Sequence, residues 1–252
     1  MSVTGAPTME RFRGLARSSP WRWTSLRFVL VEGDECETIR AWIHRPDLLR
    51  VESLEGRVLI PQRQRLPRLL ARHPPRQSLR PRPLDPDAPR AEVGPDGLVR
   101  SRPSGFDVQY DDPMYQSYRW VAMLDPVELA EPCWREPTGE PPVTFSDFAA
   151  VEHHGRPAWQ AVGVPTRSYD ARCPCCPLLD SGPAAAKADE SLGRVAAPTA
   201  EDGIAHLVVL DVKTGICVLT RQLGGAQNGL GHDIRIEVVD APRPDLPFER
   251  AT

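Results

Sequence analysis

Short segments in which apolar and polar residues alternate occur near both ends of this chain, at residues 23–30, 39–44 and 234–239. Successive side chains of a β-strand point to opposite faces, so this alternation predicts strands with one apolar and one polar face. An antiparallel sheet that buries only one of its faces has this pattern. The apolar positions of the first two segments are predicted to share the buried face: Leu26, Phe28, Leu30, Ile39, Ala41 and Ile43.

The other elements are predicted from residue spacing and turn residues. In chain order they are a helix over 10–19, a four-stranded meander over 21–60, a helix over 114–131 with a break at Asp125-Pro126, a hairpin over 148–164, and closing strands over 205–212, 216–223 and 232–239. No strand–helix–strand crossover pattern occurs. The sequence therefore predicts an α+β fold, with a curved antiparallel sheet of roughly eight to eleven strands and short helices covering its concave face.

Two segments are predicted to interrupt this single domain, which spans residues 10–248. Eleven prolines lie between Pro61 and Pro113, and residues 61–102 carry ten Arg against four acidic residues. Prolines at this density exclude a central strand, so residues 61–112 are expected to form an exposed insertion that proteases cut before residues 21–60. A basic nucleic-acid arm is the other interpretation, but the segment lacks the interleaved aromatic residues that stack on bases. Residues 181–203 are predicted to form a second loose loop.

Three motifs stand out within this order of elements. They are the Arg-Pro-Asp turn with the strand after it at 45–57, Leu-Asp-Val-Lys-Thr-Gly-Ile at 210–216, and Arg-Ile-Glu-Val-Val-Asp at 235–240. Together with the short N-terminal helix and the Trp-Thr-Ser-Leu-Arg-Phe strand, they resemble the lipoprotein-carrier (LolA-like) superfamily, over residues 10–60 and 114–248. The resemblance implies a half-barrel of antiparallel strands. Helices would close its concave face and form a cavity for acyl chains or a docking surface.

The apolar face and this resemblance lead us to expect non-enzymatic binding of a hydrophobic, lipid-like ligand. Trp120 and Trp159 are predicted to line the cavity together with the six apolar positions named above. A protein-interaction or regulatory module that uses the same face is the alternative. The sequence contains no Gly-x-Ser-x-Gly and no His-Glu-x-x-His motif, and no cofactor is expected.

A cysteine cluster offers a third class of function, a zinc- or thiol-dependent protein. Cys173, Cys175 and Cys176 could supply three ligands to Zn²⁺, which prefers four in tetrahedral geometry. The spacing is not that of the usual paired Cys-x-x-Cys units, and the intervening prolines stiffen the turn. We therefore expect a reduced loop without metal that packs over one mouth of the half-barrel.

Two adjacent histidines, His153 and His154, are expected at a hairpin turn beside Glu152. Paired imidazoles can ligate a metal or shuttle protons. Consecutive strand residues point to opposite faces, however, so the two rings should rarely act on one centre. A solvated turn is the favoured interpretation.

Compartment and partners are predicted from what the sequence lacks. The first thirty residues contain five Arg and no apolar stretch like a signal-peptide core. No window approaches the roughly 18 apolar residues of a membrane span. We therefore expect a cytoplasmic protein with reduced thiols, no membrane span and, at a net charge of −3, no nucleic-acid partner.

Overall fold

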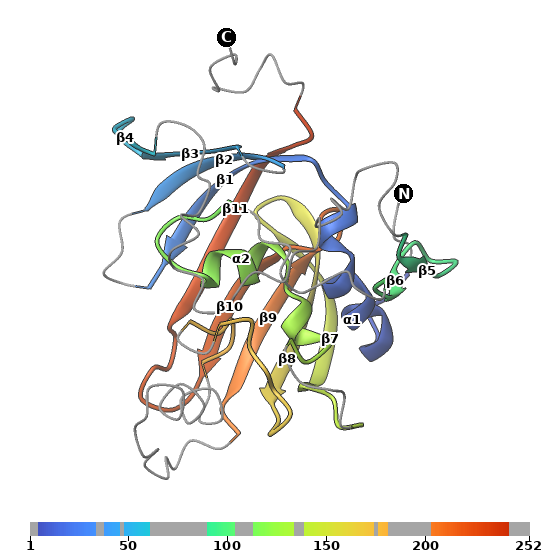
Figure 1. The fold of residues 1–252 in the computed structure, drawn as a ribbon. Helices are drawn as coiled ribbons and strands as arrows, with labels where there is room; N and C mark the ends of the chain where they lie inside the picture. Colours follow the sequence, from blue (N-terminus) through green and yellow to red (C-terminus); the bar gives the residue numbers. More distant parts are fainter. Residues whose placement is uncertain are drawn as a thin grey trace, which may run out of the picture.

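The computed structural model describes residues 5–33, 38–45, 48–60, 90–103, 113–133, 139–173, 176–180 and 203–241. Nine strands form its main sheet: β1 (Ser25–Glu32), β2 (Ile39–His44), β3 (Leu48–Ser53), β4 (Val58–Ile60), β7 (Val143–His153), β8 (Arg156–Pro165), β9 (Ala205–Asp211), β10 (Cys217–Leu223) and β11 (Gly231–Val239). Their order in the sheet is β4-β3-β2-β1-β11-β10-β9-β8-β7 (Figure 1).

The sheet consists of two meanders, β1–β4 and β7–β11, which meet where β1 pairs with β11. Every neighbouring pair is antiparallel, as the alternating pattern predicts. The predicted meander over 21–60, the hairpin over 148–164 and the three closing strands are all present. The sheet is open, with β4 and β7 at its edges, and the α+β class is confirmed.

Two short helices lie on one face of this sheet, as Figure 1 shows. Helix α1 (Met9–Ser18) matches the helix predicted over 10–19 and is followed by the 3₁₀ turn η1 (Ser19–Trp21). Helix α2 (Arg119–Leu124) is much shorter than the predicted 114–131, and a 3₁₀ turn, η3 (Val127–Leu129), follows it. Gln116 has a φ of 64°, which excludes a helix before α2. After α2 the chain leaves the helix at Asp125, because the residue before a proline disfavours helical geometry.

Residues 90–103 depart from the prediction that the whole of 61–112 protrudes. They form a small hairpin of β5 (Glu92–Val93) and β6 (Val99–Ser101), which packs against α1. Leu98 and Val99 are buried, and the Val99 backbone N–H donates to Ser18 Oγ at 2.9 Å. The proline density of the segment hid this apolar Leu-Val pair. The rest of the predicted insertion and residues 181–202 lie outside the described residues.

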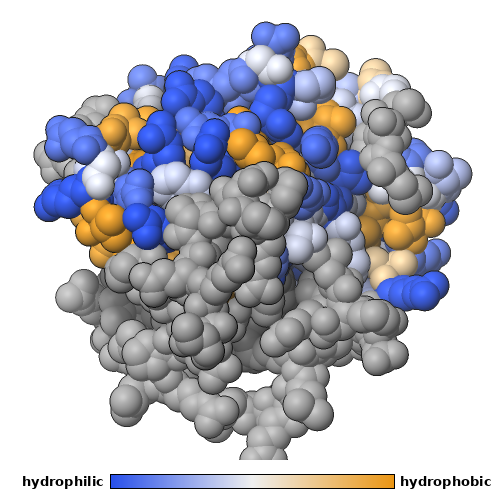
Figure 2. All heavy atoms as spheres, turned by 90° about the horizontal axis from the view of Figure 1, so that it is seen from above, coloured by the Kyte–Doolittle hydropathy of each residue, from blue (hydrophilic) through white to orange (hydrophobic). Residues whose placement is uncertain are grey.

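The hydrophobic core lies between the sheet and the elements that cover it. Phe12 of α1 packs against Phe145 of β7, with ring centroids 4.9 Å apart, and Phe28 of β1 packs against Trp120 of α2. Seen from above, the part of the surface formed by described residues is largely hydrophilic, with hydrophobic side chains in separate small groups (Figure 2). Within the described residues, no helix combines the length and the apolar character that a membrane span requires.

Candidate functional site

The eight residues predicted to line a ligand cavity all belong to the hydrophobic core, and none is more than 4% exposed. Six of them form three directly opposed pairs between β1 and β2: Leu26 with Ile43, Phe28 with Ala41, and Leu30 with Ile39. Trp120 joins this group, because its ring lies 5.3 Å from that of Phe28, centroid to centroid. Trp159 does not, since it lies on β8, which three strands separate from β1.

Trp120 carries a polar group for which the described residues offer no partner. Its side chain is 1% exposed, and its indole N–H has no hydrogen-bond acceptor within reach. Trp23 is equally buried, but its indole N–H donates to Ser19 Oγ at 3.1 Å. A buried donor without an acceptor costs about 1–3 kcal/mol. A hydrogen-bond acceptor placed beside this indole N–H would therefore stabilise the protein.

A buried carboxylate fixes the coil of residues 166–173 and 176–180, which lies on the same side of the sheet as α2 (Figure 1). Glu128 of η3 accepts hydrogen bonds from the Tyr169 hydroxyl and from the backbone N–H groups of Arg172 and Leu178. Burial raises the pKa of Glu128, although these hydrogen bonds oppose the rise. The network holds the coil against η3 and keeps Leu178 fully buried.

A second buried carboxylate, Asp125, lies just after α2 and is completely enclosed. Its oxygens accept hydrogen bonds from Arg102, beyond the end of β6, and from Arg172, whose Nη2 lies 2.6 Å away. Burial opposes ionisation, but the two guanidinium groups outweigh it and lower the pKa of Asp125. The ion pairs connect three segments that are far apart in the sequence: the 90–103 hairpin, α2 and the coil of residues 166–173.

A third polar cluster lies between α2 and β10–β11. Arg119 contacts Asp180 at 2.8 Å, and its Nη2 lies 3.5 Å from Thr220 Oγ1. Thr220 in turn bonds to Nδ1 of His232, whose Nε2 lies 2.9 Å from the carbonyl oxygen of Cys217. A carbonyl only accepts, so Nε2 carries the proton and Nδ1 accepts from the threonine hydroxyl. Burial, aided by the charge of Arg119, lowers the pKa of His232 to about 3.

The predicted cysteine cluster is only partly visible, because Cys175 lies outside the described residues. Cys173 and Cys176 are half-buried, and the backbone N–H of Cys176 donates to the carbonyl oxygen of Cys173. Cys133 is buried beside the same coil, where its backbone N–H donates to the carbonyl oxygen of Asp170, and burial raises the pKa of its thiol well above the ordinary value. Among the described residues these cysteines do not form a three-ligand group. The metal alternative for the complete cluster stays a prediction.

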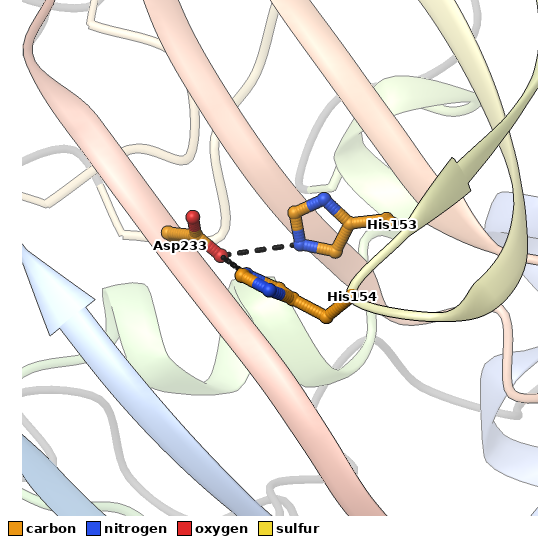
Figure 3. Close-up of side chains that lie close together, drawn as sticks. All are labelled: His153, His154 and Asp233. Carbon is orange, nitrogen blue, oxygen red and sulfur yellow. Dashed lines mark hydrogen bonds and ion pairs between the residues drawn. The ribbon is translucent and has the colours of Figure 1, made fainter.

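His153 and His154 do converge on one centre, contrary to the sequence argument. Their Nε2 atoms lie 3.1 and 2.8 Å from the same carboxylate oxygen, Oδ1 of Asp233 on β11 (Figure 3). Strand alternation ends at the turn, where His154 has a φ of 47° and Gly155 a φ of 77°. Histidine enters this left-handed region more readily than most residues. The twin histidine before a glycine was the available signal, but Asp233 lies 79 positions away in sequence.

The β7–β8 hairpin reaches Asp233 by crossing the back of the sheet. Asp233 points away from the core, because its neighbours His232 and Ile234 are buried on the side of α2. In Figure 3 the hairpin tip lies over β11 on the opposite side of the sheet from α2. Burial raises the pKa of Asp233, but hydrogen bonds from His153 and His154 outweigh it and leave the pKa lowered.

A small cleft adjoins this cluster. Its volume is about 120 Å³, and Asp233 is one of its lining residues. Apolar side chains of Val31, Leu219 and Leu230 form other parts of its wall, and Val31 and Leu230 are among the exposed large hydrophobic residues. Asp233 therefore belongs both to the histidine cluster and to a concave part of the surface.

Gly231 lines the cleft, and β10 and β11 approach each other closely at this residue. A Cβ at this position would lie 2.6 Å from the carbonyl carbon of Thr220, closer than real Cβ contacts. Gly231→Ala should therefore lower the free energy of unfolding by about 3 kcal/mol, measured by urea denaturation, because two paired strands must separate to admit the methyl group.

Gly229→Ala in the same hairpin is the matched control. Gly229 has a φ of 89° and no atom within 4 Å of the added Cβ, so it tests backbone strain alone. We expect a loss of about 1 kcal/mol there. Equal losses for the two variants would contradict the role given to Gly231.

Comparisons with known proteins give no relative for this fold and these clusters. No protein-family model matches the chain, and neither a curated protein nor a solved structure matches it.

Proposed function

We propose that this protein is a non-enzymatic binding protein of the LolA-like type, which holds a hydrophobic ligand against the apolar face of a half-barrel sheet. Two structural facts support the proposal. The sheet is an open antiparallel meander with both helices on one side. The apolar side chains of β1 and β2 form one continuous face toward α2.

The observation that carries the proposal is the unpaired indole N–H of Trp120. It lies within the apolar group formed with Phe28, where a ligand with an acyl chain and a polar oxygen would contribute both apolar contact and an acceptor. The ligand class is therefore a long-chain acid, ester or alcohol rather than a pure hydrocarbon.

A hydrophobic ligand can bind to this face only if part of the present packing moves. The side chains proposed to contact the ligand are already buried, so a ligand must displace part of what covers them. Helix α2 has only six residues and covers Phe28 through Trp120, so it is the part of that cover proposed to move. Ligand uptake is thus coupled to movement of α2.

Native mass spectrometry of the purified protein tests the proposal directly. A co-purified lipid, or one equivalent of added oleic acid that survives desolvation, is the expected result. Binding of 1-octadecene as tightly as oleic acid would contradict the role of the polar acceptor, and binding of neither would contradict the proposal.

Trp120→Phe removes the unpaired donor and keeps an aromatic ring. Oleic acid should then bind about tenfold more weakly, because one hydrogen bond is lost, whereas any binding of 1-octadecene should change little. A fluorescent fatty-acid displacement assay measures both.

Trp23→Phe is the matched control, because Trp23 is equally buried but donates to Ser19 Oγ. It should leave oleic acid affinity unchanged and destabilise the fold by about 1 kcal/mol more than Trp120→Phe. If both variants weaken fatty-acid binding alike, the effect is general destabilisation and not the Trp120 donor.

A protein-interaction module is the second candidate, and the cleft beside Asp233 favours it. Its volume of about 120 Å³ is well below the roughly 300–1,000 Å³ of ligand pockets. Exposed Val31 and Leu230 at this cleft would instead contact a partner. Two results together would establish this function: the purified protein carries no lipid, and the Leu230→Asp variant no longer binds a protein partner that the unsubstituted protein binds.

A further inference from the structure

We propose that His153, His154 and Asp233 form a binding site for a divalent transition-metal ion of the zinc class, at the tip of the β7–β8 hairpin (Figure 3). This site lies on the opposite face of the sheet from the proposed hydrophobic ligand and does not depend on it.

The geometry of the three side chains is close to that of a metal site. Zn–N and Zn–O bonds of about 2.0–2.2 Å place the ligand atoms of a tetrahedral site about 3.3 Å apart. The two imidazole Nε2 atoms lie 3.1 and 2.8 Å from Asp233 Oδ1, and all the potential ligand atoms of the group lie within 4.8 Å of one another. The two histidine–aspartate separations are therefore within about 0.5 Å of those in a zinc site.

The donor set selects the class of ion. Imidazole nitrogens suit Zn²⁺, Cu²⁺, Ni²⁺ and Co²⁺, whereas Mg²⁺ and Ca²⁺ prefer oxygen ligands alone. Two imidazoles and one carboxylate are also the three protein ligands of many open zinc sites. The carboxylate offsets one of the two charges of the ion.

The backbone around the cluster orients the ligands before any ion binds. The hairpin turn through His154 and Gly155 places both rings on one side, with centroids 4.4 Å apart. His153 Nε2 also lies 3.2 Å from the carbonyl oxygen of Ile234, the first residue beyond the β10–β11 ladder. A carbonyl only accepts, so this nitrogen carries a proton in the metal-free protein and must lose it when the ion binds. A strand and a tight turn thus hold the three side chains in place, which reduces the entropy lost on binding.

Three protein ligands leave at least one coordination position open. The side chains of His154 and Asp233 are 39% and 37% exposed, so the ion is reachable from solvent. Asp233 also lines the small cleft, and a donor atom in that cleft would lie near the ion. The open position is therefore available to water or to a small oxygen or nitrogen ligand.

The test is a titration of chelator-treated full-length protein with Zn²⁺ against a fluorescent zinc indicator, repeated with Co²⁺ and followed by absorption. One equivalent of zinc should bind with micromolar affinity or better. The Co²⁺ complex should show visible d–d bands without the intense near-ultraviolet bands of thiolate coordination.

Variants separate this site from the cysteine cluster. His154→Asn removes the imidazole but keeps a residue that tolerates a positive φ, and Asp233→Asn keeps the size and the hydrogen-bonding oxygen. Each should weaken zinc binding by about 100-fold or more, while His44→Asn and Cys175→Ser should leave it unchanged. Circular dichroism confirms that the variants are folded.

Three results would overturn the proposal. One is the absence of zinc binding at micromolar concentrations. Another is zinc binding that Cys175→Ser abolishes and His154→Asn does not. The third is thiolate charge-transfer bands in the Co²⁺ complex. In each case the two histidines would simply hold the hairpin to β11 by hydrogen bonds to Asp233.

Discussion

Replacing Asp125 with Asn should lower the free energy of unfolding by about 3–5 kcal/mol, or prevent folding altogether. The substitution keeps the size of the side chain but removes the only negative charge that contacts both Arg102 and Arg172 among the described residues. The side chain of Asp125 is 0% exposed, and those of the two arginines are 6% and 1% exposed. Two buried guanidinium groups would then lose their shared counter-ion. Urea denaturation followed by circular dichroism measures the loss.

Asp96→Asn is the control for this substitution. Asp96 pairs with Arg11 at 3.3 Å, but its side chain is 32% exposed, so solvent screens the pair. Surface ion pairs of this kind contribute about 0–1 kcal/mol. A loss at Asp125 no greater than the loss at Asp96 would show that the buried cluster does not hold the 90–103 hairpin and the coil of residues 166–173 to α2.

Lowering the pH from 6.5 to 4.5 should destabilise the protein by about 2 kcal/mol through His232 alone. The pKa of His232 is about 3 in the folded protein, whereas an imidazole in the unfolded chain titrates near 6.5. Below pH 6.5 the unfolded chain therefore binds a proton that the folded protein does not. Stability falls with pH from 6.5 until the pH reaches the folded pKa. Urea denaturation at several pH values gives the slope.

His232→Gln isolates this contribution. Glutamine offers an acceptor to Thr220 and a donor to the Cys217 carbonyl, but it does not titrate. We expect the mean slope between pH 6.5 and 4.5 to decrease by about 1.2 kcal/mol per pH unit relative to the unsubstituted protein. Burial also lowers the pKa of His206, so the stability of His232→Gln should still fall with decreasing pH, but less steeply. An unchanged slope in His232→Gln would mean that His232 is accessible to protons in the folded state.

The strands could be predicted from sequence because one face of this sheet is buried. Alternation with a period of two, interrupted by turn residues, gave β1 to β4 and β8 to β11 to within about two residues, whereas β7 begins at Val143, five residues before the predicted start. The β5–β6 hairpin was missed because its strands are only two and three residues long and lie in a proline-rich segment. An alternating pattern cannot be recognised in strands this short, least of all between prolines.

The polar clusters could not be predicted because each joins segments that are distant in sequence. Asp125 meets Arg172 across 47 positions, and His154 meets Asp233 across 79. Nothing local distinguishes these residues from solvent-exposed charges. For the histidines there is a more specific reason. Strand alternation does not extend to His154, which lies in the turn, where a positive φ changes the direction of its side chain.

The pairing of β1 with β11 also determines when the protein can fold during synthesis. Phe28 lies opposite Ile236, roughly 200 positions later in the chain, and these two strands form the middle of the sheet. A ribosome adding about 5–20 residues per second must work for ten seconds or more after β1 emerges before its partner exists. Throughout that time the inner strand edge and apolar face of the first meander have no permanent partner. Folding is therefore completed only after translation has passed β11, and until then we expect the exposed strand edge to be open to pairing with other chains.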